Sequence, residues 1–345
     1  VKGGRLVRIK DMDKVSISSR FVFTIKVKNG KAMRACRWTP RGFAEVPHVH
    51  YNPEDIFASS PQLYMIRYLC SRAAATGRRV CHLDCKRAFS TTPFKDGKTI
   101  FVKLPKGYEV RDENGDYYGL ELTNSVYGLK ESNSDWEKRL RSALNKLGYT
   151  STIQAVTTYT FKGCTILCWV DDLFVLPPIG CEDPDNFVKE LAEHLTTELG
   201  SKVVSFGVLE SALGMTFEWS EDGTCSLGQE PYLDSCLAEL ELENVRTRRL
   251  PADPNFDLAV ALESKPLGPK QKSRFCSMTG KLLWAYRCIF VEIAWAVNMC
   301  SRYMHNPTEG MLDLAVNIFG YLKSVKGSKL VYSRESCGGV SEELK

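Results

Sequence analysis

The sequence predicts an α+β protein, with strands concentrated in the first two thirds of the chain and helices in the last third. Three observations support this fold class. Alternating apolar residues flank Asn29-Gly30 within segment 20–38, as in a β-hairpin. Apolar runs of strand length then recur up to residue 229, interrupted by amphipathic segments. From about residue 230 onward, the apolar spacing is that of helices.

A helix is predicted at residues 61–76, where the chain carries residues typical of helix ends. Ser60 is a suitable N-cap, Pro61 fits the first helical position, and Gly77 terminates the segment. The apolar segment that follows, 78–84, has the length of a short buried strand and ends in an aspartate.

The remaining elements are predicted from the same patterns. Further strands are expected at 99–105, 117–123, 157–161, 164–170, 173–176, 202–208, 212–219 and 224–229. Helices are expected at 134–149, 185–200, 275–304 and 308–325, with a proline-rich polar linker at about 250–273. The large aromatic residues of the last helices, Trp284, Phe290 and Trp295, are expected to serve packing.

Composition narrows the class of protein. The chain has 345 residues, of which 43% are hydrophobic and 25% are charged, as in a globular protein. Its thirteen cysteines include no CxxC pair, which favours a reducing, intracellular compartment over a disulfide framework. Apolar runs stay below the roughly 18 residues of a membrane span and no signal peptide is recognised, so no membrane partner is expected.

The front of the chain is basic. Residues 1–45 hold twelve Lys and Arg against three Asp and Glu, although the net charge of the whole chain is only +5. Such a segment suits a polyanionic partner, and a solvated basic surface is an equal alternative. His48 and His50 follow soon after, and both are expected to be surface residues because no third metal ligand is close in the sequence.

Three aspartates stand where strands should be apolar. Asp84 ends one predicted strand, and Asp171 and Asp172 interrupt the apolar run 164–176 at a tight turn. A solvated turn and a helix cap are the simpler explanations. If the strands are neighbours, the carboxylates converge and need counter-charge, for which Mg²⁺ or Mn²⁺ is suited. Two such ions promote in-line displacement at phosphorus.

Motifs along nearly the whole chain resemble, in order, the reverse transcriptase domain of copia-type LTR retrotransposons. The similar segments are RACRWTPRGF (34–43), HLDCKRAFSTTPFKDGKTIFVKLPKGYE (82–109), SVYGLKESNSDW (125–136), CWVDDLFVL (168–176) and ALGMTFEW (212–219). Segments 232–240, 277–288 and 296–334 resemble the thumb and connecting parts of that family. Their order and spacing carry the resemblance more than any single motif does.

The resemblance implies a right-hand polymerase with fingers, a ferredoxin-like palm and a mostly helical thumb and connection. It places partial fingers at 1–80, the palm with an interleaved fingers segment at 81–230, and thumb and connecting helices without an RNase H part at 231–345. The implied activity is RNA-dependent DNA synthesis. Its partners are an RNA template, a DNA primer and deoxynucleoside triphosphates, and the oligomeric state is left open.

The resemblance also implies roles for individual residues at the site of chemistry. Asp84 and Asp171 match the principal ligands of two Mg²⁺ (or Mn²⁺) ions, and Asp172 matches the accessory carboxylate near the primer end. Catalysis in such a site consists mainly of positioning and electrostatic stabilisation.

A nucleotide-binding set is implied as well, made of Phe89, Arg34, Arg37, Arg41, Tyr127 and Gly128. Phe89 matches an aromatic gate under the sugar, with an ordinary core phenylalanine as the alternative. Among the three arginines, which suit a triphosphate, Arg37 is the preferred candidate. Tyr127 and Gly128 match positions against the templating base pair, and for Gly128 an ordinary turn glycine is the alternative.

Several positions depart from the family pattern. Ala35 replaces a lysine, Trp169 replaces the tyrosine of the YVDD box, ESNSDW (131–136) replaces QAPRAW, and Arg87 replaces a threonine. Two functions therefore stand side by side: an active reverse transcriptase, or a degenerate or domesticated copy that keeps the fold and binds nucleic acid without turnover. A third hypothesis, an RNA-dependent RNA polymerase, predicts copying with ribonucleotides.

Overall fold

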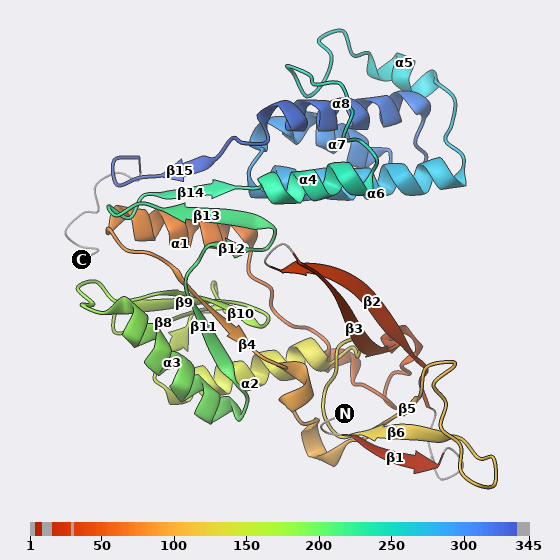
Figure 1. Ribbon diagram of the computed structural model, residues 1–345, viewed down its shortest axis with the longest axis vertical. Helices are drawn as coiled ribbons and strands as arrows, with labels where there is room; N and C mark the ends of the chain where they lie inside the picture. The colour runs from red at the N-terminus through yellow and green to blue at the C-terminus, as the bar shows by residue number, and fades with distance from the viewer. Residues whose placement is uncertain (1–3, 9–15, 29–30, 337–345) are drawn as a thin grey trace. The chain divides into compact units, whose positions relative to one another are not determined.

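The computed structural model describes residues 4–8, 16–28 and 31–336 (Figure 1). The fold is α+β, as the sequence predicts, with helices and antiparallel sheets in both halves of the chain. The chain divides into two compact units, each built from two separate stretches of sequence. The first unit comprises 1–61 and 81–207, and the second comprises 62–80 and 208–345. The division into fingers, palm and thumb at residues 80 and 230 stays a prediction.

A six-stranded antiparallel sheet forms the centre of the first unit. Its spatial order is β11 (Val203–Val208), β4 (Cys81–Cys85), β10 (Asp172–Leu176), β9 (Cys164–Trp169), β8 (Thr158–Phe161) and β7 (Thr150–Ser151). Along the chain, β4, helix α2 (Ser132–Lys146), β9, β10, helix α3 (Pro184–Leu199) and β11 follow a βαββαβ pattern. This chain order, combined with the spatial order β11-β4-β10-β9, is the ferredoxin-like arrangement.

Helices α2 and α3 bury their apolar stripes against this sheet. Both helices and the strands contribute to one core cluster, which includes Leu83, Leu144, Leu173 and Leu195. Local sequence fixes the ends of α3: the Asp183 side chain accepts a hydrogen bond from the Asn186 backbone at 3.0 Å, and Gly200 ends the helix with φ 55°.

Two smaller sheets complete the first unit. One has the order β1 (Gly4–Arg8), β6 (Tyr118–Leu122) and β5 (Ile100–Lys103). The other is the predicted hairpin, β2 (Ser19–Lys28) with β3 (Lys31–Pro40). Its predicted turn, Asn29-Gly30, lies outside the described residues. Single-turn 3₁₀ helices occur at η2 (Gly42–Ala44), η3 (Pro53–Asp55), η4 (Phe89–Thr91) and η5 (Lys95–Gly97).

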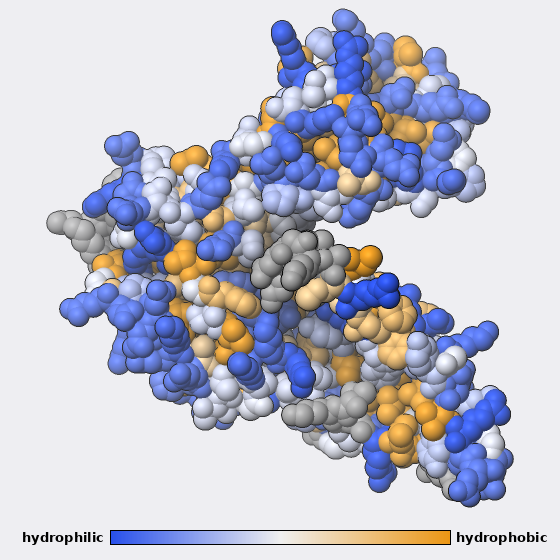
Figure 2. Space-filling view, in the orientation of Figure 1, coloured by the Kyte–Doolittle hydropathy of each residue, from blue (hydrophilic) through white to orange (hydrophobic). Residues whose placement is uncertain are grey.

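The second unit combines a four-stranded sheet with helices. The sheet order is β12 (Ser211–Ala212), β13 (Met215–Trp219), β14 (Cys225–Gly228) and β15 (Leu330–Tyr332). Helix α1 (Leu63–Ala75) packs near β14 and β15. The other helices are α4 (Glu230–Glu239), α5 (Leu258–Glu263), α6 (Pro269–Cys288), α7 (Ala294–Arg302) and α8 (Glu309–Val325), with η6 (Val291–Ile293) between α6 and α7. The surface of the helical part seen in Figure 2 is largely hydrophilic, with scattered apolar side chains.

The predicted start of α1 was wrong. The helix begins at Leu63, because Gln62 has extended backbone angles (φ −71°, ψ 141°) and its side chain makes no capping hydrogen bond. Ser60 does not cap this helix because the N-cap position is occupied by Gln62, two residues further along the chain. Pro61 therefore precedes the helix instead of occupying its first position.

Three other predictions in the second unit also need correction. The strand expected at 212–219 is divided by a turn at Leu213-Gly214, where both residues have positive φ. The helix expected at 275–304 breaks after Cys288, and the next residues, Ile289 and Phe290, are both buried. The linker expected at about 250–273 contains helix α5 and the first turn of α6.

Candidate active site

The three aspartates predicted for the site meet at one end of the six-stranded sheet. Asp84 on β4 is directly opposite Asp172 on β10 in the antiparallel register. Directly opposed residues project to the same face of a sheet. Their neighbours Leu83 and Leu173 lie in the helix-covered core, so both carboxylates project from the other face. Asp171 lies in the turn that enters β10.

The turn that carries Asp171 is strained and held from two sides. Trp169 pairs with Asp172, which leaves a two-residue loop whose first residue, Val170, has φ 57°. Glycine is usual at such a position, and positive φ in a β-branched residue is a genuine outlier. The indole N–H of Trp136 on α2 donates to the Val170 carbonyl at 2.7 Å, and the Cys85 N–H donates to the Asp171 carbonyl at 2.8 Å.

Asp84 and Asp172 each contact a basic side chain. The partner of Asp172 lies on β4, and the partner of Asp84 directly follows that strand. Asp84 Oδ1 lies 2.8 Å from the ammonium of Lys86, and Asp172 Oδ1 lies 2.7 Å from Nε2 of His82. The His82 ring also stacks on Phe174, at 5.5 Å between centroids. The chain itself thus provides a cation, Lys86, beside Asp84 and a hydrogen-bonding ring, His82, beside Asp172.

Asp171 is held differently, by a neutral donor. Its Oδ2 accepts a hydrogen bond from the Tyr127 hydroxyl at 3.2 Å. Burial raises the pKa of Asp171, and the negative charges of Asp172 and Asp84 raise it further, against the lowering effects of its backbone N–H and of Tyr127. The ionised carboxylate is therefore less favourable here than in water, and nearby positive charge would favour it.

The donor chemistry of the three carboxylates fits a hard divalent cation, because oxygen ligands with excess negative charge suit Mg²⁺ and Mn²⁺. Across residues 4–8, 16–28 and 31–336, however, no three His, Cys, Asp or Glu side chains are arranged as a group able to hold a metal. Lys86 and His82 instead occupy two of the carboxylate oxygens. A cation that bound at these same two oxygens would have to displace Lys86 and His82.

Tyr127 connects the carboxylates to the hairpin. The guanidinium of Arg37 on β3 lies 4.2 Å from the centre of the Tyr127 ring, and Phe89 packs edge-on against the same ring at 4.5 Å. Burial, followed by the charge of Asp171 and its hydrogen bond, raises the pKa of Tyr127 to about 12. Tyr127 therefore remains a neutral hydrogen-bond donor at physiological pH.

The other predicted nucleotide-binding residues differ in their exposure and in the direction of their side chains. Arg34 lies on β3 three residues before Arg37, so the two project from opposite faces of the hairpin. Arg34 and Arg41 are both exposed. Phe89 is buried in the core cluster of the six-stranded sheet, as the alternative interpretation expects, and its role beneath a sugar stays a prediction.

Gly128 is required by a close backbone approach. Its φ is +106°, and a Cβ atom there would lie 2.5 Å from the Thr39 methyl and 2.6 Å from the Pro40 carbonyl oxygen. A Cβ on Gly42 would in turn lie 1.9 Å from the Gly128 carbonyl oxygen. The two glycines therefore seat the loop before α2 directly on the end of the hairpin.

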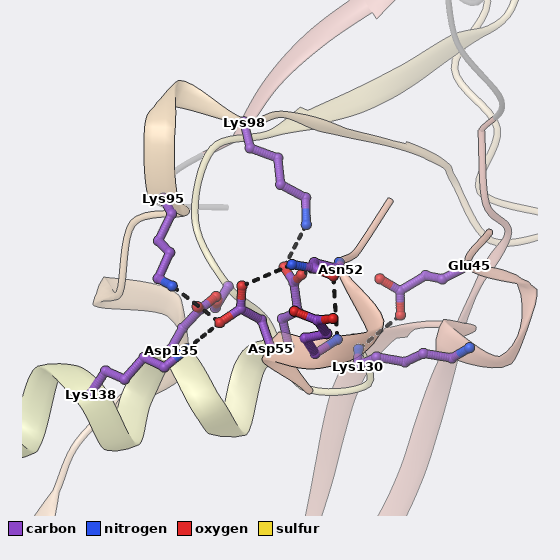
Figure 3. A network of polar contacts seen from close by, with 11 residues as sticks. Glu45, Asn52, Asp55, Lys95, Lys98, Lys130, Asp135 and Lys138 are labelled. Carbon is purple, nitrogen blue, oxygen red and sulfur yellow. Dashed lines mark hydrogen bonds and ion pairs between the residues drawn. The ribbon is translucent and has the colours of Figure 1, made fainter. Parts of the chain in front are cut away.

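A polar network that the sequence analysis missed fastens the same loop (Figure 3). The buried Glu45 carboxylate accepts a hydrogen bond from the Lys130 N–H at 2.8 Å. Glu131 accepts from the Asn52 N–H at 2.6 Å and pairs with Lys98 at 2.5 Å. A cavity of about 410 Å³ is lined in part by Asn52, Lys98 and Glu131. The sequence contained one indication of this network. Segment 1–45 has only three acidic residues, and Glu45 is one of them.

The histidine prediction was half wrong. His50 is buried, and its Nδ1 accepts a hydrogen bond from the Val46 N–H at 2.9 Å, whereas His48 is exposed as expected. The short loop from Val46 to Tyr51 folds back on itself through the His48 N–H and the Tyr51 carbonyl, at 2.7 Å. A polar ring can be buried in such a loop because the loop backbone satisfies one of its nitrogens.

Glu45→Gln should stabilise the fold selectively at high pH. Burial raises the pKa of Glu45 from 4.5 to about 7, so the folded state retains a proton that the unfolded state loses. The wild-type free energy of unfolding should therefore fall as pH rises from 4.5 through 7. At pH 8 the variant should exceed the wild type by roughly 2–3 kcal/mol, with little difference at about pH 4.5, in denaturant titrations.

Glu54→Gln is the matched control for this substitution, since Glu54 is an exposed glutamate in the same region. Its effect should be small and equal at both pH values. A pH-independent effect of Glu45→Gln would contradict the buried, proton-retaining state of Glu45.

A ferredoxin-like sheet with paired aspartates at the end of its central strands is the arrangement that the resemblance to right-hand polymerases predicts. The chain belongs to the reverse transcriptase (RNA-dependent DNA polymerase) family, whose model matches residues 5–254. No helix within the described part of the chain combines the length and the apolar character needed to cross a membrane.

Relatives come from transposons. The chain is 25% identical over 331 residues to a retrovirus-related Pol polyprotein from transposon TNT 1-94 of Nicotiana tabacum, covering 92% of this chain and 24% of that protein. It is 25% identical to a putative transposon Ty5-1 protein of Saccharomyces cerevisiae, covering 72% and 78%. The chain thus spans about a quarter of the first of these relatives. A foamy viral protease-reverse transcriptase in complex with double-stranded DNA gives a TM-score of 0.48 at 13% identity, covering 94% and 45%.

Proposed function

We propose that this chain catalyses template-directed transfer of deoxynucleotides to a DNA primer on an RNA template. The observation that carries the proposal is the direct cross-strand pairing of Asp84 with Asp172, beside the strained turn that presents Asp171. Family membership supports the reaction class. Asp84 and Asp171 would hold two Mg²⁺ or Mn²⁺ ions, with Asp172 as the accessory carboxylate.

The chain's own residues supply position and electrostatics in this proposal. Bound divalent cations would lower the pKa of the primer hydroxyl and neutralise the triphosphate. The two contacts on the turn, from Trp136 and Cys85, hold Asp171 in place relative to Asp84. Tyr127 donates to Asp171 and thereby fixes the direction of its carboxylate. Preorganisation of this kind is a major source of catalytic power.

The incoming nucleotide would be received by residues around Tyr127. Arg37 already lies over the Tyr127 ring and carries the fixed positive charge suited to a triphosphate. Phe89 packs against the same ring from the core side, and the hydroxyl of that ring donates to Asp171. We assign selection against a 2′-hydroxyl to Phe89, and close approach of the templating base pair to Tyr127 and Gly128.

Primer extension by the purified chain tests the proposal. With an RNA template, a labelled DNA primer, deoxynucleotides and Mg²⁺, we expect extension products that disappear on chelation. Ribonucleotides should be used poorly, and efficient copying with them would instead indicate an RNA-dependent RNA polymerase. Absence of products under both Mg²⁺ and Mn²⁺, with template–primer bound, would reject the activity.

A second candidate is a copy that binds nucleic acid without turnover. Two observations favour it: Lys86 and His82 already satisfy two of the carboxylates, and Glu131 stands in the altered ESNSDW motif, tied to Lys98 and Asn52. Binding that weakens steeply with salt, without any extension, is its expected result.

A further inference from the structure

A short arginine-rich segment of the second unit is fixed along helix α8. This arginine segment comprises residues 245–250, VRTRRL, and has no helical or strand structure of its own. The Arg248 N–H donates to the Gly320 carbonyl at 3.1 Å, and the Ser324 hydroxyl donates to the Arg248 carbonyl at 2.8 Å. The Lys323 ammonium donates to the Val245 carbonyl at 3.1 Å. The backbone of the segment is therefore held by the helix.

Gly320 is the position that allows this contact. A Cβ atom there would lie 2.4 Å from the Arg246 carbonyl oxygen and 3.1 Å from Cγ of Arg248. Only glycine lets the segment lie this close to α8 without displacement. The aliphatic stem of Arg248 thus rests beside the helix while its residue remains exposed overall.

The three arginines of the segment have no carboxylate partner among the described residues. Arg246, Arg248 and Arg249 are exposed, and none forms an ion pair within 4.0 Å with any described residue. Lysines of the same unit behave differently, since ion pairs are made by Lys281 with Glu239, Lys326 with Asp234 and Lys329 with Glu218. These three lysines are therefore paired with carboxylates of described residues, whereas the arginines of the segment are not.

A hollow adjoins the arginine segment. A cavity of about 180 Å³ is lined by Arg248, Arg249 and Asn317, together with the acidic Asp253 and small apolar residues. Guanidinium groups bind phosphate oxygens bidentately, and an amide such as that of Asn317 can add a donor. The hollow is therefore chemically suited to an anionic group of phosphate size.

We propose that the arginine segment binds the phosphate backbone of a nucleic-acid duplex, an inference that rests on the proposed function. The three arginines lie within four consecutive residues, so their charges are concentrated in one short stretch of the surface. Its backbone is already ordered, which reduces the conformational entropy lost on binding. The segment has no aromatic residue on which single-stranded bases would stack, which favours a duplex as the partner.

The triple variant Arg246→Gln, Arg248→Gln, Arg249→Gln in the full chain tests this inference. Its control, Lys281→Gln, Lys326→Gln, Lys329→Gln, removes the same formal charge from the same unit at ion-paired positions. Anisotropy titrations with a labelled RNA–DNA hybrid duplex from about 50 to 200 mM salt measure affinity. For the arginine variant, the slope of log K against log salt should shrink by about 2–3, with at least roughly tenfold weaker binding.

The outcomes separate this inference from the proposed function. If the wild type binds no duplex, both fail together. If the wild type binds and the arginine variant matches the lysine control, the arginine segment is not a phosphate site and the proposed function is untouched. If the arginine variant loses affinity only for single strands, the duplex assignment is wrong. Support requires weaker duplex binding with an unchanged extension rate at saturating template–primer, because no arginine of the segment belongs to the site of chemistry.

Discussion

Asp171→Asn should abolish primer extension while leaving the fold at least as stable as the wild type. The substitution removes a proposed metal ligand, and loss of such a preorganised electrostatic group lowers turnover by roughly 10³-fold or more. Stability should not fall, because burial and the charges of Asp84 and Asp172 disfavour the ionised carboxylate that is removed. Extension kinetics and thermal unfolding of the same preparation measure both effects.

Asp185→Asn provides the matched control for Asp171→Asn. Asp185 is an exposed aspartate in the first turn of α3, with the same change of charge and shape on substitution. Extension by this variant should be close to that of the wild type. Activity of Asp171→Asn within tenfold of Asp185→Asn would show that the carboxylate at the turn is not part of the chemistry.

Gly42→Ala should destabilise the protein by about 3–5 kcal/mol, the range of severe core overpacking. The new Cβ would lie 1.9 Å from the Gly128 carbonyl oxygen, and backbone atoms cannot move aside as a flexible side chain can. Gly128→Ala adds a positive φ to a similar clash and should cost at least as much. Urea denaturation curves measure the change in unfolding free energy.

Gly97→Ala separates steric overlap from backbone strain. Gly97 has φ +67°, but a methyl group added there would meet nothing within 4 Å, so its substitution should cost only about 1 kcal/mol. If Gly42→Ala were no worse than Gly97→Ala, the loop before α2 would be free to withdraw from the hairpin. That result would contradict the close seating of Gly128 on Pro40.

The central strands of the palm were predictable because local sequence and tertiary setting agree there. The apolar run 164–176 with two aspartates at a turn has few alternatives to a buried hairpin. The direct opposition of Asp84 and Asp172 was not predictable, since it depends on pairing between strands about ninety residues apart. Helix α1 shows the usual weakness at boundaries, where Pro61 fits both the start of a helix and the residue before one.

The surroundings of the site were harder to predict than its carboxylates. Nothing local in the sequence indicates that Tyr127 contacts Asp171 and Arg37, because both contacts join elements distant in the chain. Glu45 illustrates the same point, because its buried carboxylate accepts a hydrogen bond from a backbone N–H 85 residues away in the chain. Such partners become visible only when the fold brings them together.

The indole of Trp136 makes the position of Asp171 dependent on a helix that carries none of the three carboxylates. The indole N–H donates a hydrogen bond to the carbonyl of Val170, the residue of the turn that has positive φ. A shift in how α2 packs on the sheet would therefore be transmitted to Asp171, the proposed metal ligand, through a single peptide group. Variation in the interior-facing side chains of this helix is accordingly a route by which drifting copies of such a sequence lose activity while every acidic residue is retained.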